Sequence, residues 1–290
     1  MKKIGLYNVD SKLPNLAIMK LSAWHKQQGD VVNWCGSPIE AMMFDKVYGS
    51  QIFTDSERWD APNLEMGGSG YDMHKKLPQE IDDMFPDYSL YPDYNDSLGF
   101  TTRGCIRNCE FCFVPKMEGG IHEYRNIRDV YRGGNIVIMD NNILAMPKKF
   151  KEILHFAKEK KCKVDFNQGL DCRLVTMEIA EVIKEHRRYI RPYLRFAFDN
   201  LNYKKSVEDT CKWLGIKKMF WYVYCDEDYE SALERLLILK RLDQTPYLMR
   251  NKRLKGQQQF IWLAKWVNSM SAFKKMNIWD IAKLKYEKGE

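Results

Sequence analysis

The stretch that decides the fold is residues 135–167, which read NIVIMDNNILAMPKKFKEILHFAKEKKCKVDFN. It begins with an apolar run at 135–140 and ends with another at 163–167, and both are typical of buried strands. Between them, one face of a helix is marked at helical spacing by Phe150, Ile153, Leu154 and Ala157. A strand, a helix and a second strand in this order predict a βαβ unit with parallel strands.

The same alternation extends in both directions from this unit. Six strand-like runs occur in all, at 98–103, 135–140, 163–167, 194–199, 219–224 and 246–249. Helical patterns separate most of them, for example at 179–183, 207–214 and 233–237. Six such units predict a partial (β/α)6 TIM-like barrel over residues 98–250. In that architecture, chemistry is located at the C-terminal ends of the strands.

The first hundred residues predict a smaller unit of the same α/β class. Strand-like runs at 3–9, 31–34, 46–48 and 64–66 alternate with a helical segment that opens near Pro14. This order predicts a Rossmann-like parallel α/β domain over residues 1–76. Residues 77–97, rich in Pro, Asp and Tyr, are expected to form a linker, and residues 251–290 a basic helical extension.

Composition excludes several classes of protein. The chain has 290 residues, of which 45% are hydrophobic and 29% charged, as expected for a globular protein of two domains. No run approaches the roughly 18–20 apolar residues of a membrane helix, so we expect a cytoplasmic protein with no membrane partner. The net charge of +7 is uneven, because residues 1–98 carry 9 Lys/Arg against 15 Asp/Glu and residues 243–290 carry 10 against 4. The basic end favours an anionic partner, or it is a solvated helical surface.

A cluster of cysteines follows the first strand of the predicted barrel, in residues 99–112, GFTTRGCIRNCEFC. Cys105, Cys109 and Cys112 place three thiols within eight residues, and thiolates are ligands for zinc or iron–sulfur clusters. Structural zinc normally has four protein ligands, whereas three cysteines on a four-iron cluster leave one iron open. The remaining cysteines show no metal-binding spacing and are interpreted as packing residues: Cys35, Cys162, Cys172, Cys211 and Cys225.

The spacing C-x3-C-x-aromatic-C, with Phe111 as the aromatic residue, resembles that of the radical S-adenosylmethionine (SAM) superfamily over residues 97–250. The resemblance implies a [4Fe-4S] cluster on Cys105, Cys109 and Cys112, with SAM chelating the fourth iron. It also implies reductive cleavage of SAM to methionine and a 5′-deoxyadenosyl radical, with electrons from a donor such as flavodoxin or ferredoxin. Phe111 would then lie beside the adenine.

Polar residues at later strand ends are candidate SAM contacts. Asp140 and Asn141 follow the second strand and offer oxygen acceptors to the amino group of SAM. Arg173, with Asn167 nearby, follows the third strand and could bind the SAM carboxylate. Asp199 follows the fourth strand and could bind the ribose hydroxyls. Turns, helix caps and structural salt bridges explain these residues equally well. The sequence assigns no catalytic residue for the substrate, which could be a nucleotide, a nucleic acid or a peptide.

The N-terminal unit is similar in its position to the domain of cobalamin-binding-type radical SAM proteins. Such domains commonly carry D-x-H-x-x-G after the first strand, but residues 10–15 here read DSKLPN, without histidine. Asp72 and His74 form the only D-x-H string, outside that position. Cobalamin is therefore a less favoured additional cofactor, and the sequence leaves its binding as an open alternative. The alternative function is a non-catalytic protein that holds zinc on the three cysteines and binds nucleic acid.

Overall fold

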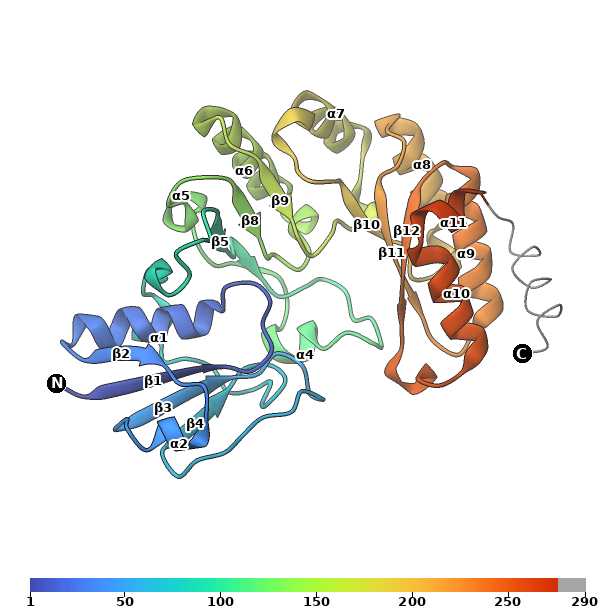
Figure 1. Cartoon of the computed structure of the whole chain (residues 1–290). Coiled ribbons are helices and arrows are strands. Elements are labelled where there is room, and N and C mark those ends of the chain that lie inside the picture. The colour runs from blue at the N-terminus through green and yellow to red at the C-terminus, as the bar shows by residue number, and fades with distance from the viewer. Residues whose placement is uncertain (276–290) are drawn as a thin grey trace. The chain divides into compact units, whose positions relative to one another are not determined.

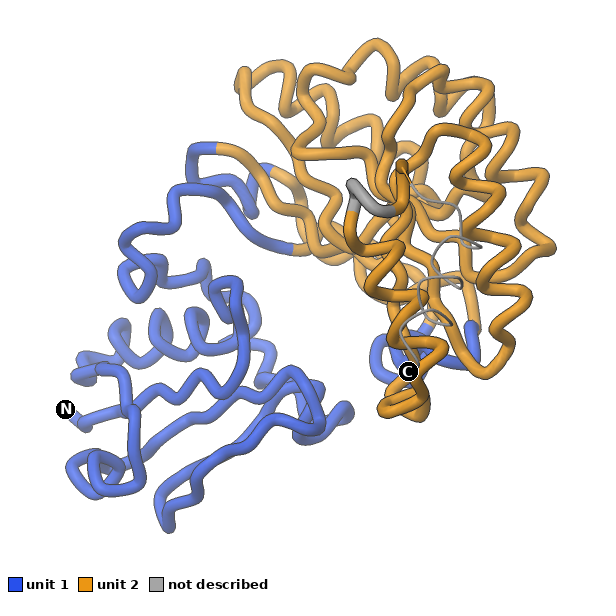
Figure 2. Tube along the Cα trace, turned by 45° about the vertical axis from the view of Figure 1, so that its right-hand side comes forward, with its two compact units in different colours: residues 1–99, 109–119, 128–134 blue, residues 100–108, 120–127, 135–290 orange. Residues whose placement is uncertain are grey.

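The computed structural model describes residues 1–275, without the side chains of 270–272, and the chain divides into two compact units (Figure 2). Unit 1 comprises residues 1–99, 109–119 and 128–134, and unit 2 comprises residues 100–108, 120–127 and the chain from 135 onward. The part of the predicted C-terminal extension at 276–290 lies outside the described residues. No helix in residues 1–275 is long and apolar enough to cross a membrane.

Unit 1 is built on a four-stranded parallel sheet, which confirms the predicted α/β class for this part of the chain. Its strands are β1 (Lys3–Asn8), β2 (Val31–Trp34), β3 (Lys46–Ser50) and β4 (Leu64–Gly67), in the order β2-β1-β3-β4 (Figure 1). The connections include α1 (Leu16–Gln27) and α2 (Pro38–Ala41). Helix α1 begins after Asn15, whose side chain accepts a hydrogen bond from the backbone N–H of Ile18 at 3.3 Å.

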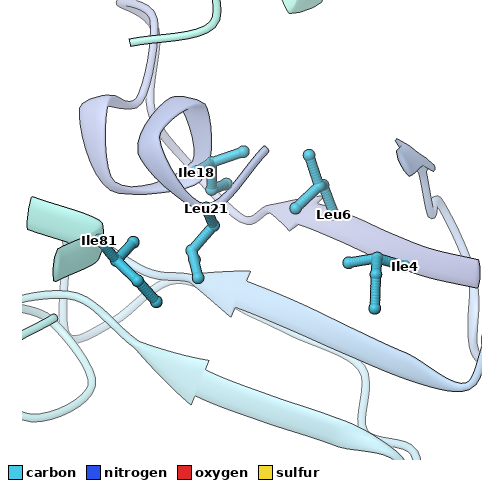
Figure 3. Close-up of a cluster of buried hydrophobic side chains, with 5 residues drawn as sticks. All are labelled: Ile4, Leu6, Ile18, Leu21 and Ile81. Atoms are coloured by element: carbon cyan, nitrogen blue, oxygen red, sulfur yellow. The ribbon is translucent and has the colours of Figure 1, made fainter. Parts of the chain in front are cut away.

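The core of unit 1 lies between β1 and the helices beside it. Figure 3 shows a cluster of five buried aliphatic side chains: Ile4, Leu6, Ile18, Leu21 and Ile81. Ile81 comes from α3 (Gln79–Asp82), within the segment 77–97 that the sequence indicates as a linker. The same segment contains η1 (Tyr88–Leu90), where the buried Tyr88 hydroxyl accepts from the Leu98 N–H at 2.9 Å. Residues 77–97 thus belong to unit 1 and contribute the buried side chains of Ile81 and Tyr88 to it.

At the carboxyl ends of β1 and β3, polar side chains bind the backbone of the adjoining loop. The two carboxylate oxygens of Asp10 accept from the N–H groups of Ile52 and Phe53, each at 2.8 Å. Gln51 is fully buried and donates from Nε2 to the carbonyl of Phe53 at 2.7 Å and to that of Ser56 at 3.3 Å. These side chains therefore act to hold the loops of their own unit.

Unit 2 contains five parallel strands that follow one another in chain order. They are β8 (Ile136–Ile138), β9 (Val164–Phe166), β10 (Arg195–Ala197), β11 (Phe220–Cys225) and β12 (Thr245–Arg250). Strand β8 pairs with β9, and β11 pairs with both β10 and β12. Parallel bridges from Val164 to Ile190 and from Leu170 to Phe196 link the β9 region to that of β10. This arrangement confirms the parallel α/β class for unit 2.

Helices follow most of these strands. The α-helices are α6 (Pro147–Lys160), α7 (Met177–Glu185), α8 (Lys204–Leu214), α9 (Tyr229–Arg241), α10 (Gln258–Asn268) and α11 (Met270–Lys275). Shorter 3-10 turns are η2 (Ile143–Ala145), η3 (Cys172–Leu174), η4 (Arg187–Tyr189), η5 (Leu201–Tyr203) and η6 (Lys252–Leu254). Helix α6 packs on β9, and α9 packs on β11 and β12 (Figure 1). The remaining short elements are β5 (Ser97–Gly99), β6 (Thr102–Arg103), α4 (Val114–Glu118), β7 (His122–Glu123) and α5 (Ile127–Val130).

The sheet formed by β10, β11 and β12 has two unlike faces. Alternate residues are buried on one face, namely Phe196, Trp221, Val223 and Leu248. The opposite face carries side chains such as Tyr222, which is half-buried, and Tyr247, which is exposed. Such alternation is the pattern of a strand that is covered on one side.

The outer edge of β12 is covered by a side chain of α10. Asn268 accepts from the N–H of Leu248 at 2.8 Å and donates to the Leu248 carbonyl at 3.2 Å. One amide side chain therefore makes the two hydrogen bonds that a neighbouring strand would otherwise make.

Candidate functional site

The cysteine motif lies in a loop that leaves unit 2 and returns to it. Strands β6 and β7 pair antiparallel, with Thr102 opposite Glu123 and Arg103 opposite His122, and they close the base of residues 104–121. Cys105 belongs to unit 2, whereas Cys109, Cys112 and Phe111 belong to unit 1. Within unit 1 the N–H of Cys112 donates to the carbonyl of Cys109 at 2.9 Å, in the turn that precedes α4.

The start of this loop is anchored by Asp140, at the end of β8. Its carboxylate accepts from the backbone N–H groups of Thr101 and Thr102, at 2.6 and 3.0 Å, and from both threonine hydroxyls. Asp140 is only 2% exposed, and this burial raises the pKa of its carboxyl while the four hydrogen bonds act against the rise. The sequence suggested Asp140 as an acceptor for the amino group of SAM, but its geometry is that of an anchor for the segment leading to Cys105.

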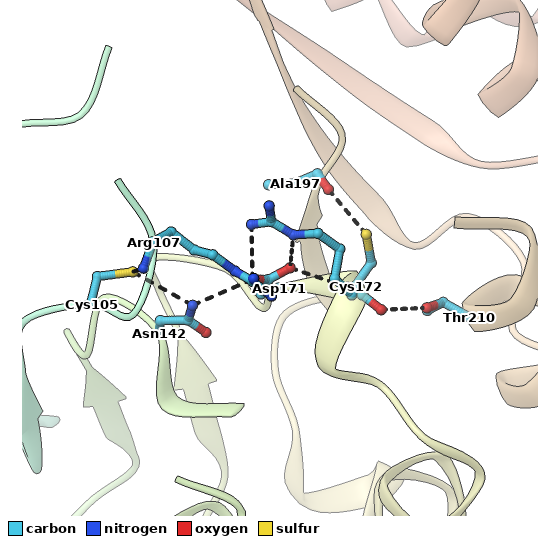
Figure 4. A network of polar contacts seen from close by, with 8 residues as sticks. Cys105, Arg107, Asn142, Asp171, Cys172, Ala197 and Thr210 are labelled. Atoms are coloured by element: carbon cyan, nitrogen blue, oxygen red, sulfur yellow. Dashed lines mark hydrogen bonds and ion pairs between the residues drawn. The ribbon is translucent and has the colours of Figure 1, made fainter. Parts of the chain in front are cut away.

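Asp171 is the centre of a polar network at the strand ends of unit 2 (Figure 4). Arg107, from the cysteine loop, donates from Nε to Asp171 Oδ2 at 2.9 Å. Arg173 donates through two nitrogens, at 2.6 and 2.9 Å, and its guanidinium lies 4.1 Å from the ring centroid of Tyr203. Burial alone would raise the pKa of Asp171, but the two guanidiniums lower it below its usual value. Asp171 is therefore an ionised hub that joins two arginines.

Asn142 connects this hub to the first cysteine. Its Nδ2 donates to Cys105 Sγ at 3.6 Å and to Asp171 Oδ2 at 3.4 Å (Figure 4). Cys105 Sγ also accepts from the backbone N–H of Arg107 at 3.3 Å. Asn142 is 4% exposed, and its Oδ1 has no hydrogen-bond partner within residues 1–275. Buried acceptors are usually paired, so this oxygen is suited to receive a hydrogen bond from a ligand beside Cys105.

The other predicted SAM contacts occupy separate places. Asn167 donates from Nδ2 to Met139 Sδ at 3.5 Å, and Asn141 is half-buried next to Asn142. Asp199 accepts from the Tyr224 N–H at 2.8 Å. Burial raises the pKa of Asp199, while the charges of Arg235 and Arg173 act against that rise. Phe111, in unit 1, is 44% exposed.

Unit 2 thus brings Cys105, Asn142, Asp171 and Arg173 together with Arg107. Three of these, Arg107, Asn142 and Asp171, are absent from the candidate residues that the sequence supplied. Arg107 and Asp171 are 64 positions apart, so no local pattern signals their contact. The signal available in the sequence is the charge of Arg107 inside the cysteine motif, because an arginine that is not solvated requires an acidic partner.

The eight cysteines fall into two groups by environment. Cys105, Cys109, Cys112 and Cys211 are partly exposed, whereas Cys35, Cys162, Cys172 and Cys225 are buried. Burial raises the pKa of the Cys172 and Cys211 thiols to about 12 and that of Cys225 to about 11, and it also raises the pKa of Cys35 and Cys162. Because the thiolate is the metal ligand, these five thiols are poor ligands.

Within residues 1–275, no three His, Cys, Asp or Glu side chains are already grouped as a metal site. The donor set nevertheless fits an iron–sulfur cluster in its chemistry, since it supplies three accessible thiols and N–H donors to Cys105 Sγ.

No protein-family model matches the chain, and no curated protein sequence matches it either. The functional interpretation therefore depends on the residues of the chain itself.

Proposed function

We propose that the chain is a radical SAM enzyme with a [4Fe-4S] cluster on Cys105, Cys109 and Cys112. The observation that carries the proposal is the C-x3-C-x-F-C spacing, whose first cysteine lies against Asn142 in the polar network of unit 2. The proposal includes a partial (β/α)6 TIM-like barrel for the second part of the chain. Parallel strands in chain order with intervening helices support that architecture.

Several residues would hold the cluster and SAM. The N–H groups that point to Cys105 Sγ would stabilise a ligating thiolate. When bound, the cluster would supply the electron that cleaves SAM into methionine and a 5′-deoxyadenosyl radical. Arg173, held by Asp171, would bind the SAM carboxylate with its guanidinium group. The unpaired Oδ1 of Asn142 would accept from the amino group.

The remaining contacts are assigned by position. Asp199 uses Oδ1 for the Tyr224 N–H, which leaves Oδ2 for a ribose hydroxyl. Phe111 would lie beside the adenine, with Asn141 and Asn167 as further polar contacts. The electron donor would be a flavodoxin or a ferredoxin in the cytoplasm. The N-terminal sheet supports a Rossmann-like domain related to cobalamin-binding ones. Cobalamin remains the less favoured additional cofactor, since the residues that follow β1 include no histidine in the D-x-H-x-x-G position.

The test is anaerobic reconstitution with iron and sulfide, followed by iron analysis and measurement of 5′-deoxyadenosine release under reducing conditions. We expect Cys105→Ala, Cys109→Ala and Cys112→Ala each to abolish both signals. Cys162→Ala and Cys211→Ala are the matched controls and should retain them. A Cys109→Ala protein that still holds full iron would refute the assignment. Colourless protein with stoichiometric zinc would favour the alternative, a zinc-holding nucleic-acid-binding protein without catalysis.

A further inference from the structure

The face of the β10–β11–β12 sheet opposite its buried side carries a continuous group of aromatic rings. We call this group, made up of Tyr193, Phe220, Tyr222 and Tyr247, the aromatic face. The ring centroids of Phe220 and Tyr247 are 5.8 Å apart at 27°, and those of Tyr193 and Phe220 are 6.5 Å apart at 22°. Tyr222 stands nearly perpendicular to both Phe220 and Tyr247. Four rings therefore form one surface across two neighbouring strands and the segment before β10.

The aromatic face is accessible and its polar atoms are unused. Tyr193 is 54% exposed and Tyr247 is 42% exposed, while Phe220 and Tyr222 are half-buried. The hydroxyls of Tyr193, Tyr222 and Tyr247 make no hydrogen bond with any residue in 1–275. Rings packed only to fill a core would bury such hydroxyls against partners. These rings instead offer flat apolar surface together with free hydrogen-bonding groups.

Positive charge lies at the end of the same sheet. The segment that ends β12 and follows it, called here the basic segment, carries four exposed cations: Arg250, Lys252, Arg253 and Lys255. Arg250 and Arg253 form no ion pair within residues 1–275. Residues 243–275 carry seven Lys/Arg against one Asp/Glu.

Other charged groups lie near this face. Arg195, which also lies on it, is paired with Asp165 and adds no net charge. Asp226 and Asp228, which follow β11, accept from the backbone N–H groups of Asp228 and Ser231 at the start of α9. Asp226 and Asp228 keep their negative charge, and the exposed Glu227 lies between them. The four cations of the basic segment outnumber these three carboxylates, so the balance of charge beside the aromatic face is positive.

We propose that the aromatic face and the basic segment form a binding surface for single-stranded nucleic acid. Bases stack on the tyrosine and phenylalanine rings, and phosphates contact the exposed cations at the end of β12. Aromatic rings on a sheet with adjacent cations are the combination that binds unpaired nucleotides with little sequence preference. A purely apolar partner would use neither the free hydroxyls nor the unpaired guanidiniums. This surface does not involve the cysteines, so the inference stands whether or not the chain is a radical SAM enzyme.

The test is fluorescence anisotropy of the full chain, without iron or SAM, using labelled oligouridylate and oligothymidylate of about ten nucleotides. We expect binding that weakens steeply as salt rises. Tyr247→Leu should weaken it about tenfold, and Tyr222→Leu with Tyr247→Leu roughly a hundredfold, because leucine keeps apolar area but cannot stack. Tyr222→Phe with Tyr247→Phe should retain most of the affinity. Arg250→Gln with Arg253→Gln should reduce the salt dependence.

The matched control is Tyr71→Leu, which removes a tyrosine of similar exposure, 48%, from unit 1 and should leave binding unchanged. Thermal unfolding of each variant checks that the fold is intact. Tyr247→Trp offers a larger ring for stacking and should bind more tightly, so it tests the surface by a gain of affinity. Tighter binding of the ribose oligomer would identify RNA as the preferred ligand, and equal or tighter binding of the deoxyribose oligomer would identify single-stranded DNA. Either result supports the surface. Absence of binding at low salt, or equal affinity of the leucine and phenylalanine double variants, would overturn it.

Discussion

The strand ends of the two units use polar side chains in different ways. In unit 1, Asp10 and Gln51 bind backbone groups of the loop that follows β3. In unit 2, Asp171 and Asn142 bind side chains from other parts of the chain, among them Arg107 and Cys105. The first arrangement satisfies its members internally, whereas the second leaves Asn142 Oδ1 without a partner within residues 1–275.

This difference separates structural polar groups from candidate functional ones within the same fold class. A polar group that satisfies a loop contributes to stability, and its loss should leave ligand binding intact. Loss of a group from a network of side chains in which one polar atom has no partner should instead weaken ligand binding and change stability little. Asp140 is an informative exception, because it lies in unit 2 but binds backbone and threonine hydroxyls as the unit 1 residues do.

The largest effect is expected for Asp140→Ala. It removes the acceptor of four buried hydrogen bonds and should lower the free energy of unfolding by about 3 kcal/mol or more. Urea unfolding measures the loss, and Thr101→Val combined with Asp140→Ala should be strongly non-additive because the two residues share their bonds. A normally stable Asp140→Ala protein with weakened SAM binding would show that Asp140 is a direct SAM contact instead.

The next effect concerns Asp171→Ala, which removes the shared partner of Arg107 and Arg173. We expect SAM affinity of the reconstituted protein to fall roughly tenfold to a hundredfold, since both guanidiniums lose their fixed position. Anaerobic titration calorimetry measures this change. Asp10→Ala is the control from unit 1 and should reduce stability without changing SAM affinity. Equal losses of affinity in the two variants would remove the distinction between the two strand ends.

A smaller and more specific effect is expected for Asn142→Leu. Removing a buried, unpaired oxygen compensates for the two long hydrogen bonds that are lost, so stability should change by less than about 1 kcal/mol. SAM affinity should nevertheless fall about tenfold. The control is Asn63→Leu in unit 1, where Nδ2 donates to the carbonyls of Ala41 and Phe44 at 2.8 Å. That variant should lose stability and keep SAM affinity, and the opposite pattern would contradict the comparison.

The smallest effect is a pH dependence in unit 1. Burial alone would raise the pKa of Asp87, but bonds from Lys26, Ser22 and Ser89 lower it from 3.8 to about 2. Because the folded-state pKa is lowered, this carboxylate stabilises the fold above pH 3.8, and the contribution is lost as pH falls toward 2. Wild type should therefore be more stable than Asp87→Asn at neutral pH, and the gap should close on acidification. Urea unfolding at a series of pH values tests this, and a gap that widens in acid would refute it.

The sequence predicts the fold class and the strands well because both depend on local patterns. The run at 219–224 became β11 at Phe220–Cys225, and the run at 31–34 became β2 at Val31–Trp34. Short runs rich in Val and aromatic residues are a local signal for such strands. The parallel order then follows from the intervening helices.

The features that the sequence did not predict depend on contacts between distant residues. Strands β6 and β7 have two residues each and are polar in part, so they carry no periodic signal. Residues 77–97 resemble a linker in composition, but they belong to unit 1 and pack the buried side chains of Ile81 and Tyr88 into it. The polar network around Asp171 joins Arg107 to a residue 64 positions away. Only the folded chain shows which polar residues meet.

The amide of Asn268 on the outer edge of β12 bears on how copies of the chain behave toward one another. By occupying the N–H and the carbonyl of Leu248, it makes these two backbone groups unavailable to a strand from a second molecule. Replacing it with alanine would leave the backbone groups of Leu248 available for edge-to-edge association. The Asn268 side chain on α10 thus opposes association of copies of the chain through β12 at high protein concentration.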